Sequence, residues 1–319
     1  MKITVLDGYA LNPGDNPWTA VEALGDLTVY DRTPPELLLE RAQGADILLT
    51  NKTVLSKDTI HALSDLKFIS VLATGYNIVD TVAAAERGIP VSNVPAYSTS
   101  SVAQLTFTLI LELCHGTAAH SSSVHAGGWV QAKDYSYWVQ ALTELKDKVI
   151  GIVGMGAIGQ KVAEIAAAFG MKILAYNPHR RPLDVGYAFT YVTLEELYAN
   201  ADIITLHCPL KPENTGMIGK EAIDRMKPNA WIINTARGQL IDEAALAEAL
   251  NSGRIAGAAL DVLSSEPPKA ENPLLSAKNT IITPHIAWAT LDARKRLMQV
   301  TADNIRAFLD GSPINVVNR

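Results

Sequence analysis

Three segments in the second half of the sequence carry side chains that can bind an anion and transfer a proton. The segments are NTARGQLID (234–242), ALDVLSSEPP (259–268) and TPHIAW (283–288). They contain Arg237, Glu266 and His285, and each follows a predicted strand. Parallel strands present their carboxyl ends at one edge of a sheet, where open α/β sheets bind ligands, so we expect the three residues to meet there. Arginine donates two parallel hydrogen bonds to a carboxylate, and imidazole exchanges protons near neutral pH.

The stretch VIGIVGMGAIGQ (149–160) contains the pattern G-x-G-x-x-G at Gly154, Gly156 and Gly159. It follows an apolar strand and opens a predicted helix that can end at Gly170. In this context Gly154 permits a tight turn, Gly156 lets backbone N–H groups approach a pyrophosphate, and Gly159 allows close helix packing. The predicted cofactor-binding residues of this loop are Gly154, Met155, Gly156, Ala157, Ile158 and Gly159.

The stretch LAYNPHRRP (174–182) bears on the choice of cofactor. A dinucleotide fold usually offers a carboxylate to the ribose about 20 residues after the glycine loop. Asn177 occupies that place here, and it does not repel a 2′-phosphate. His179, Arg180 and Arg181 follow it and can reach such a phosphate. Both NAD and NADP fit this pattern, and NADP is slightly favoured.

Composition sets the broad class. The chain has 319 residues, 48% of them hydrophobic and 19% charged, with a net charge of −6. No basic block indicates a nucleic acid or a membrane surface. The N-terminal MKITVLDGYA predicts a first strand rather than a leader. Cys114 and Cys208 do not form a disulfide framework, which favours a cytoplasmic location.

Short β-branched runs alternate with helical stretches along the whole chain, which is typical of parallel sheets covered by helices. The first set of predicted strands is Ile3–Leu6, Leu27–Tyr30, Ile47–Thr50, Phe68–Leu72 and Val91–Asn93. The second set has six strands, which start at Val149 and continue with Lys172–Tyr176, Asp202–Leu206, Trp231–Asn234, Ala256–Leu260 and Thr280–Thr283. We therefore expect an α/β protein with two doubly wound domains. Residues 1–99 and 287–319 form a flavodoxin-like substrate domain, and residues 100–286 form a Rossmann dinucleotide-binding domain.

Several helix signals accompany these strands. Asp80 is a predicted helix cap, and Thr193 with Glu196 forms a capping box. Amphipathic spacing predicts a helix at Leu291–Leu309, and a further helix is expected at Ser100–Leu113.

The ordered set ATGYN, GMGAIG, HCPL, NTARG, LDVLSSEPP and TPHIAW resembles the D-isomer-specific 2-hydroxyacid dehydrogenase family over essentially the whole chain. The similarity is greatest to its glycerate dehydrogenase and hydroxypyruvate reductase branch. The resemblance implies hydride transfer between NAD(P)H and a small 2-keto acid, with hydroxypyruvate/D-glycerate or glyoxylate/glycolate favoured. It also implies that the cofactor lies between the two domains.

The family pattern also implies a role for individual residues. His285 is the acid–base, Glu266 hydrogen-bonds its ring and favours the protonated form, and Arg237 binds the substrate carboxylate. The remaining substrate residues implied are Thr74 and Gly75. Trp288 is a further candidate for the substrate site, although it can equally form a subunit contact or simply pack. The remaining cofactor residues implied are Cys208, Pro209, Thr235, Ala236 and Asp261. Asn177 departs from the family pattern, and it and Arg180 are expected at the cofactor because of their position after the second strand.

Some alternatives stay open. The same fold serves corepressors that sense a dinucleotide, and fold alone does not exclude that function. Trp129, Tyr135, Tyr137 and Trp138 can shape a substrate pocket, form a subunit contact or simply pack. We expect a homodimer built on Ser100–Leu113 and this aromatic segment. The histidine and cysteine spacings predict no metal site.

Overall fold

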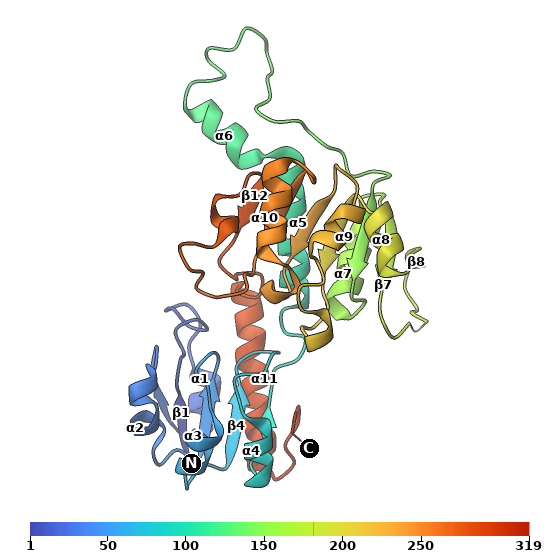
Figure 1. Cartoon of the computed structure of the whole chain (residues 1–319). Coiled ribbons are helices and arrows are strands. Elements are labelled where there is room, and N and C mark those ends of the chain that lie inside the picture. The colour runs from blue at the N-terminus through green and yellow to red at the C-terminus, as the bar shows by residue number, and fades with distance from the viewer. Residues whose placement is uncertain (181, 319) are drawn as a thin grey trace. The chain divides into compact units, whose positions relative to one another are not determined.

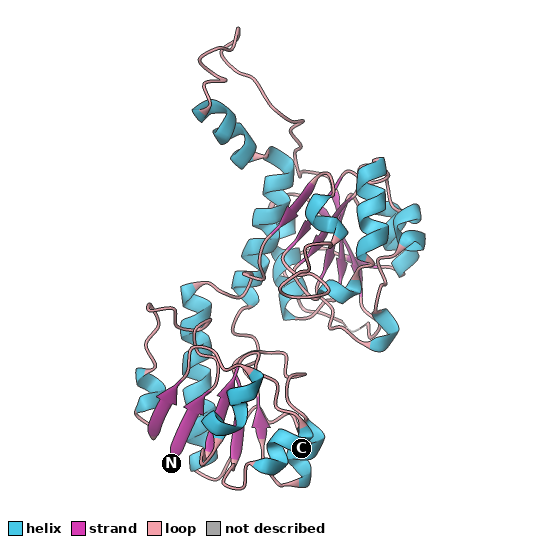
Figure 2. Ribbon diagram, turned by 60° about the vertical axis from the view of Figure 1, so that its left-hand side comes forward, coloured by secondary structure: helices cyan, strands magenta, loops and turns pink. Residues whose placement is uncertain are grey.

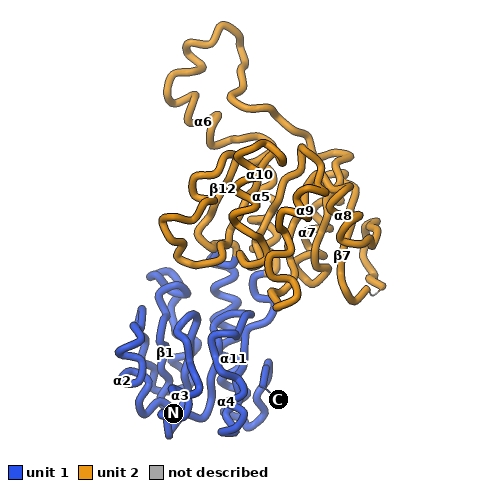
Figure 3. The backbone as a smooth tube through the Cα atoms, viewed as in Figure 1, with its two compact units in different colours: residues 1–98, 288–319 blue, residues 99–287 orange. Residues whose placement is uncertain are grey.

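The computed structural model describes residues 1–180 and 182–318. It divides into two compact units, shown in different colours in Figure 3. Unit 1 comprises Met1–Ser98 and Trp288–Arg319, and unit 2 comprises Thr99–Ala287. Each junction lies one residue from the boundary expected from the sequence.

Unit 1 is built on a parallel sheet of five strands. The strands are β1 (Lys2–Val5), β2 (Asp26–Val29), β3 (Ile47–Thr50), β4 (Phe68–Val71) and β5 (Val91–Ser92). Their order is β2-β1-β3-β4-β5, which is the flavodoxin-like order. β3 and β4 are buried throughout, as expected of strands covered on both faces (Figure 2).

The helices of unit 1 include one from the far end of the chain. They are α1 (Thr19–Glu22), α2 (Leu38–Ala42), α3 (Lys57–Ala62), α4 (Thr81–Glu86) and α11 (Leu291–Leu309). The predicted Asp80 cap is confirmed, since its side chain accepts a hydrogen bond from the N–H of Ala83. α11 has the predicted bounds and lies against the unit 1 sheet beside β4 (Figure 1). Its apolar face packs with Ile3, Phe68 and Leu72.

Unit 2 is built on a parallel sheet of seven strands. The strands are β6 (Val149–Val153), β7 (Lys172–Tyr176), β8 (Thr190–Tyr191), β9 (Ile203–Leu206), β10 (Trp231–Asn234), β11 (Gly257–Leu260) and β12 (Thr280–Ile282). Their order, β12-β11-β10-β9-β6-β7-β8, is that of a dinucleotide-binding fold with one strand added at the β12 edge. The predicted fold class of both units is confirmed.

The number of strands in the second set was predicted wrongly. The sequence indicates six, and the structure adds β8, which pairs with β7 through Thr190 and Tyr191. Two residues are too few to give an alternating pattern, so the pairing comes from the tertiary fold.

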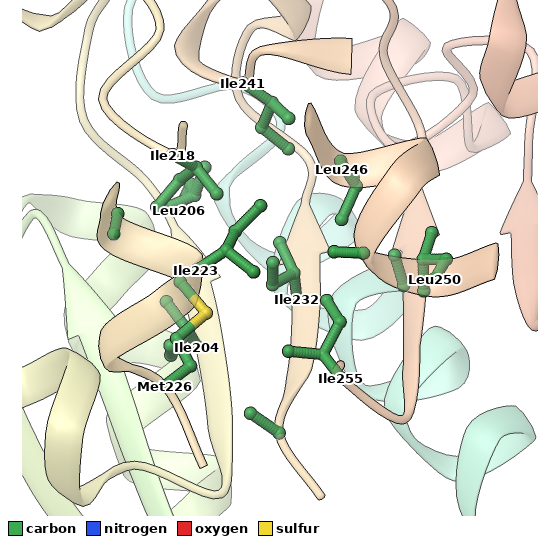
Figure 4. Packing of buried hydrophobic residues seen from close by; sticks show 14 of the residues in the cluster. Ile204, Leu206, Ile218, Ile223, Met226, Ile232, Ile241, Leu246, Leu250 and Ile255 are labelled. Carbon is green, nitrogen blue, oxygen red and sulfur yellow. The ribbon is translucent and has the colours of Figure 1, made fainter. Parts of the chain in front are cut away.

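The helices of unit 2 are α5 (Thr99–His115), α6 (Thr117–His125), α7 (Ala157–Ala168), α8 (Leu194–Asn200), α9 (Lys220–Arg225) and α10 (Glu243–Ser252). The capping box of Thr193 and Glu196 is confirmed at the start of α8. One core cluster packs α8, α9 and α10 with β9, β10 and β11, and Figure 4 shows Ile204, Ile232 and Leu250 within it. This packing fixes the strands whose ends carry the predicted catalytic residues.

α5 is longer than the predicted Ser100–Leu113, and α6 was not predicted because its apolar residues have no helical period. None of the helices described is by itself long and apolar enough to cross a membrane. α5 and α6 together reach that length and composition, but the chain bends by 55° between them.

Candidate active site

The three predicted catalytic residues follow three neighbouring strands. β10 pairs with β11, and β11 pairs with β12, in register at Asn234, Leu260 and Ile282. Arg237, Glu266 and His285 therefore emerge from the same edge of the unit 2 sheet, as expected.

His285 and Glu266 are in direct contact. Nδ1 of His285 lies 2.6 Å from Oε2 of Glu266, and both side chains are partly exposed. The second Glu266 oxygen, Oε1, accepts a hydrogen bond from the N–H of Leu263 at 3.2 Å. The carboxylate thus fixes one ring nitrogen of His285 and leaves Nε2 to act on a ligand.

The backbone of His285 has an unusual conformation that aims its ring. Its φ is +54°, in the left-handed region that few residues other than glycine adopt. Its N–H donates to the Asp261 carbonyl at 2.8 Å. Strained backbone of this kind persists only where neighbouring contacts hold it, and such sites are often functional.

Asp261 supplies those contacts. Its carboxylate accepts hydrogen bonds from the hydroxyl of Thr283 at 2.6 Å and from the N–H groups of Ile286 and Ala287 at 2.9 Å each. The side chain is buried, which raises the pKa of its carboxyl, while these hydrogen bonds act in the opposite direction. Asp261 therefore holds the turn on both sides of His285, a role that the sequence did not reveal.

Arg237 belongs to a turn that is also held by side chains. Asn234 Oδ1 accepts from the N–H of Ala236 at 2.9 Å, and its Nδ2 donates to the Arg237 carbonyl at 2.8 Å. The guanidinium is exposed and donates to the Ala236 carbonyl at 2.7 Å.

The Arg237 turn packs against the loop that carries Glu266. A Cβ at Gly238 would lie 1.9 Å from the carbonyl carbon of Leu263, so only glycine fits there. Gln239 Nε2 also donates to the Ser264 carbonyl at 2.9 Å. These contacts bring the segments of Arg237 and Glu266 together.

The glycine loop joins β6 to α7 and leaves an open cradle. Gly154 has φ +103°, and a Cβ there would lie 2.8 Å from backbone atoms of His207 and Cys208. A Cβ at Gly159 would lie 2.0 Å from the Gly154 carbonyl oxygen. Gly156, by contrast, faces open space, with no heavy atom within 4 Å of a Cβ position.

These features fit a dinucleotide. Within the described residues, the N–H groups of Gly156, Ala157 and Ile158 make no hydrogen bond, and they lie at the positive end of α7. A pyrophosphate is the anion that such a helix start binds.

Asn177 is the residue after β7, as predicted. Its Nδ2 donates to the His179 carbonyl at 2.8 Å, which leaves Oδ1 to accept from a ribose hydroxyl. Arg180 is exposed. Arg181 lies outside the described residues.

The other predicted cofactor residues differ in their exposure and in the groups that are free to contact a cofactor. Thr235 is buried, with its hydroxyl 3.1 Å from that of Thr106, so its backbone is what remains for a ligand. Cys208 is half-buried, and Pro209 is exposed. His207 follows β9, and burial lowers the pKa of its imidazole to about 3. Its Nδ1 has no hydrogen-bond partner among the described residues.

The predicted substrate residues Thr74, Gly75 and Trp288 lie in unit 1. Thr74 Oγ1 donates to the Val94 carbonyl at 2.8 Å. In the part of the chain described, the N–H groups of Thr74 and Gly75 make no hydrogen bond, so they are available to an anion. Trp288 packs edge-on against Tyr97.

The described residues contain no candidate metal centre. Across residues 1–180 and 182–318, no three histidine, cysteine or acidic side chains lie together in a way that could hold a metal ion.

Comparison with known proteins agrees with this geometry. Residues 107–287 match the family model described as D-isomer specific 2-hydroxyacid dehydrogenase, NAD binding domain. The chain is 50% identical to a hydroxypyruvate reductase of Blautia hydrogenotrophica over 322 residues, covering 100% of both chains. It is 42% identical to a glycerate dehydrogenase of Methylorubrum extorquens, covering 90% of each.

A solved structure extends the similarity. An acyclic imino acid reductase in complex with NADPH and D-Arg matches with a TM-score of 0.87 and 33% identity, covering 99% of this chain and 100% of that one. The chain belongs to the D-isomer-specific 2-hydroxyacid dehydrogenase family, and it is an oxidoreductase that uses a nicotinamide dinucleotide.

Proposed function

We propose that the protein reduces hydroxypyruvate to D-glycerate with NAD(P)H, with glyoxylate as a second substrate. The contact of 2.6 Å between His285 and Glu266 carries this proposal, because it provides an acid–base held by a carboxylate. The names of the two curated relatives favour hydroxypyruvate and its reduced product, glycerate. Both relatives bear enzyme names, which favours an enzyme over a corepressor.

His285 is the proton donor in this proposal. When bound, a nicotinamide cofactor would supply the hydride that reduces C2 of the 2-oxo acid. Nε2 of His285 then gives its proton to the carbonyl oxygen as that oxygen becomes a hydroxyl, and it removes the same proton in the reverse direction. The Glu266 carboxylate stabilises the positive ring before transfer and fixes its orientation.

Arg237 binds the substrate carboxylate and polarises the carbonyl. Its exposed guanidinium has donors to spare beyond the hydrogen bond to Ala236. Thr74 and Gly75 donate backbone N–H groups to the same class of anion. Trp288 is a further substrate residue in the proposal. Unit 1 is thus the substrate domain and unit 2 the dinucleotide-binding domain.

The proposed cofactor preference is slightly towards NADP. Asn177 does not repel a 2′-phosphate, and Arg180 is exposed three residues later. The pyrophosphate binds at Gly154–Gly159, and Cys208, Pro209, Thr235, Ala236 and Asp261 complete the cofactor site.

The protein forms a homodimer in this proposal. Among the residues that follow α6, Trp129 is 54% exposed, Val130 91%, Tyr135 91% and Trp138 66%. An exposed apolar group of this size is typical of a subunit interface. A cytoplasmic location stays a prediction from the sequence.

A panel of substrates tests the proposal. Purified protein is assayed with hydroxypyruvate, glyoxylate and bulkier 2-oxo acids, each with NADH and NADPH. Saturable oxidation of the reduced cofactor with hydroxypyruvate, giving D-glycerate, supports the proposal. Turnover of none of these acids contradicts it.

A further inference from the structure

The loop after β3 in unit 1 is held in one conformation by a single carboxylate. Asp7, which follows β1, accepts hydrogen bonds from three successive N–H groups: Asn51 at 2.7 Å, Lys52 at 2.5 Å and Thr53 at 2.7 Å. Three N–H groups around one anion form a rigid turn. The backbone of Lys52 is therefore fixed.

The same loop is tied to the loop after β4, which contains Thr74 and Gly75. β3 and β4 are neighbours, paired at Thr50 and Val71. Asn51 Nδ2 donates to the Leu72 carbonyl at 2.7 Å, and the Leu55 N–H donates to the Ile78 carbonyl at 2.8 Å. Two hydrogen bonds thus tie residues 51–55 to residues 72–78 at the carboxyl edge of the sheet.

Lys52 places a free cation at this edge. Its side chain is exposed, and its ammonium forms no ion pair or hydrogen bond with any residue that the structure describes. Lys57 and Lys67 of the same unit are instead paired, with Glu86 and Asp46. A fixed backbone with an unpaired ammonium is suited to a ligand with a complementary oxygen.

Building on the proposed function, we propose that Lys52 is a specificity-determining residue that binds the oxygen on C3 of the 2-oxo acid. With the carboxylate at the N–H groups of Thr74 and Gly75, the neighbouring loop meets the far end of the substrate. A 3-hydroxyl accepts a hydrogen bond from the ammonium. A methyl group leaves the ammonium unpaired, and sites of this kind discriminate strongly against the analogue that lacks the polar group. Lys52 therefore favours hydroxypyruvate over pyruvate.

The test measures kcat/KM of the full-length protein for hydroxypyruvate and for pyruvate. Lys52→Met is expected to lower the ratio of the two values by about tenfold or more. Most of the loss should appear in KM for hydroxypyruvate, since the interaction is with the bound substrate. Lys57→Met is the matched control: an exposed lysine of the same unit, paired with Glu86, whose removal should leave the ratio unchanged.

Asp7→Asn provides a second variant, because it loosens the loop without removing the ammonium. It should lower the same ratio by a smaller factor. An unchanged ratio in Lys52→Met, or an equal loss for both substrates, overturns the inference. A wild-type protein that reduces neither acid contradicts the proposed function instead, so the two failures are distinguishable.

Discussion

The Nδ1 atom of His285 lies 2.6 Å from the Oε2 atom of Glu266, although the two residues are 19 positions apart in the sequence. They are brought together because their segments follow adjacent strands, β12 and β11. The Asp261 carboxylate then fixes the turn around His285 through three hydrogen bonds. The position of the His285 ring thus depends on two carboxylates: Glu266 contacts the ring, and Asp261 holds the backbone turn.

Glu266→Gln should lower the turnover of hydroxypyruvate. The Glu266 carboxylate lies 2.6 Å from Nδ1 of His285, where it fixes the ring and stabilises its positive charge, and a neutral amide does this less well. The kcat for reduction should therefore fall by up to about 10²-fold, the scale of acid–base catalysis. Steady-state kinetics measures this, with Glu271→Gln, an exposed acid of the same segment, as the control. A wild-type kcat in Glu266→Gln would show that the pair has no role in proton transfer.

Asn177→Asp should move the cofactor preference towards NAD. A carboxylate there accepts from both ribose hydroxyls and repels a 2′-phosphate. The ratio of kcat/KM for NADPH to that for NADH should fall by about tenfold, which corresponds to about 1.4 kcal/mol. Arg180→Gln should shift the ratio in the same direction. If neither variant changes the ratio, the residues after β7 do not select the cofactor.

Gly238→Ala should disturb both stability and turnover. The added Cβ would lie 1.9 Å from the Leu263 carbonyl carbon, so the Arg237 turn and the Glu266 loop must separate. Overpacking of this kind costs about 1–3 kcal/mol. Gly186→Ala is the control, because a Cβ there meets nothing within 4 Å. Thermal unfolding and kcat, measured together, test this, and wild-type values for both would contradict the packing described.

The ion pair of Asp15 and Arg294 should stabilise unit 1 in a pH-dependent way. The guanidinium is buried and donates to both Asp15 oxygens, at 2.6 and 2.7 Å. This hydrogen bonding lowers the pKa of the Asp15 carboxyl below its usual value. A lowered folded-state pKa means that the stabilisation is present above the ordinary value of about 3.9 and is lost as the pH falls through the folded value.

Asp15→Asn should therefore lower Tm at pH 7, and its difference from the wild type should shrink below about pH 4. Asp303→Asn, which removes an exposed pair with Arg306, should have little effect. A difference that stays constant down to low pH would contradict the assignment.

The fold was largely predictable from the sequence because buried parallel strands leave a strong apolar signal. The strands Ile47–Thr50, Lys172–Tyr176 and Trp231–Asn234 have the predicted bounds. The sequence does not predict β8 or α6. β8 is too short for the apolar–polar alternation of a strand, and the apolar residues of α6 lack helical spacing. Both depend on contacts that local patterns do not encode.

The sequence predicts which strand ends carry the site residues, but it does not predict the conformation of the loops that hold them. The order of segments indicates which edge carries Arg237, Glu266 and His285. The left-handed backbone of His285 and its support by Asp261 depend on hydrogen bonds between residues more than 20 positions apart. No spacing rule reveals such contacts.

The most direct test of the account is the turnover of His285→Ala with its cofactor affinity measured in parallel. Loss of the proton donor should lower kcat for hydroxypyruvate by about 10²-fold or more, whereas Kd for NADPH should stay close to that of the wild type. His61→Ala, which removes an exposed histidine of unit 1, should change neither value. A His285→Ala protein that turns over hydroxypyruvate at nearly the wild-type rate would contradict the account.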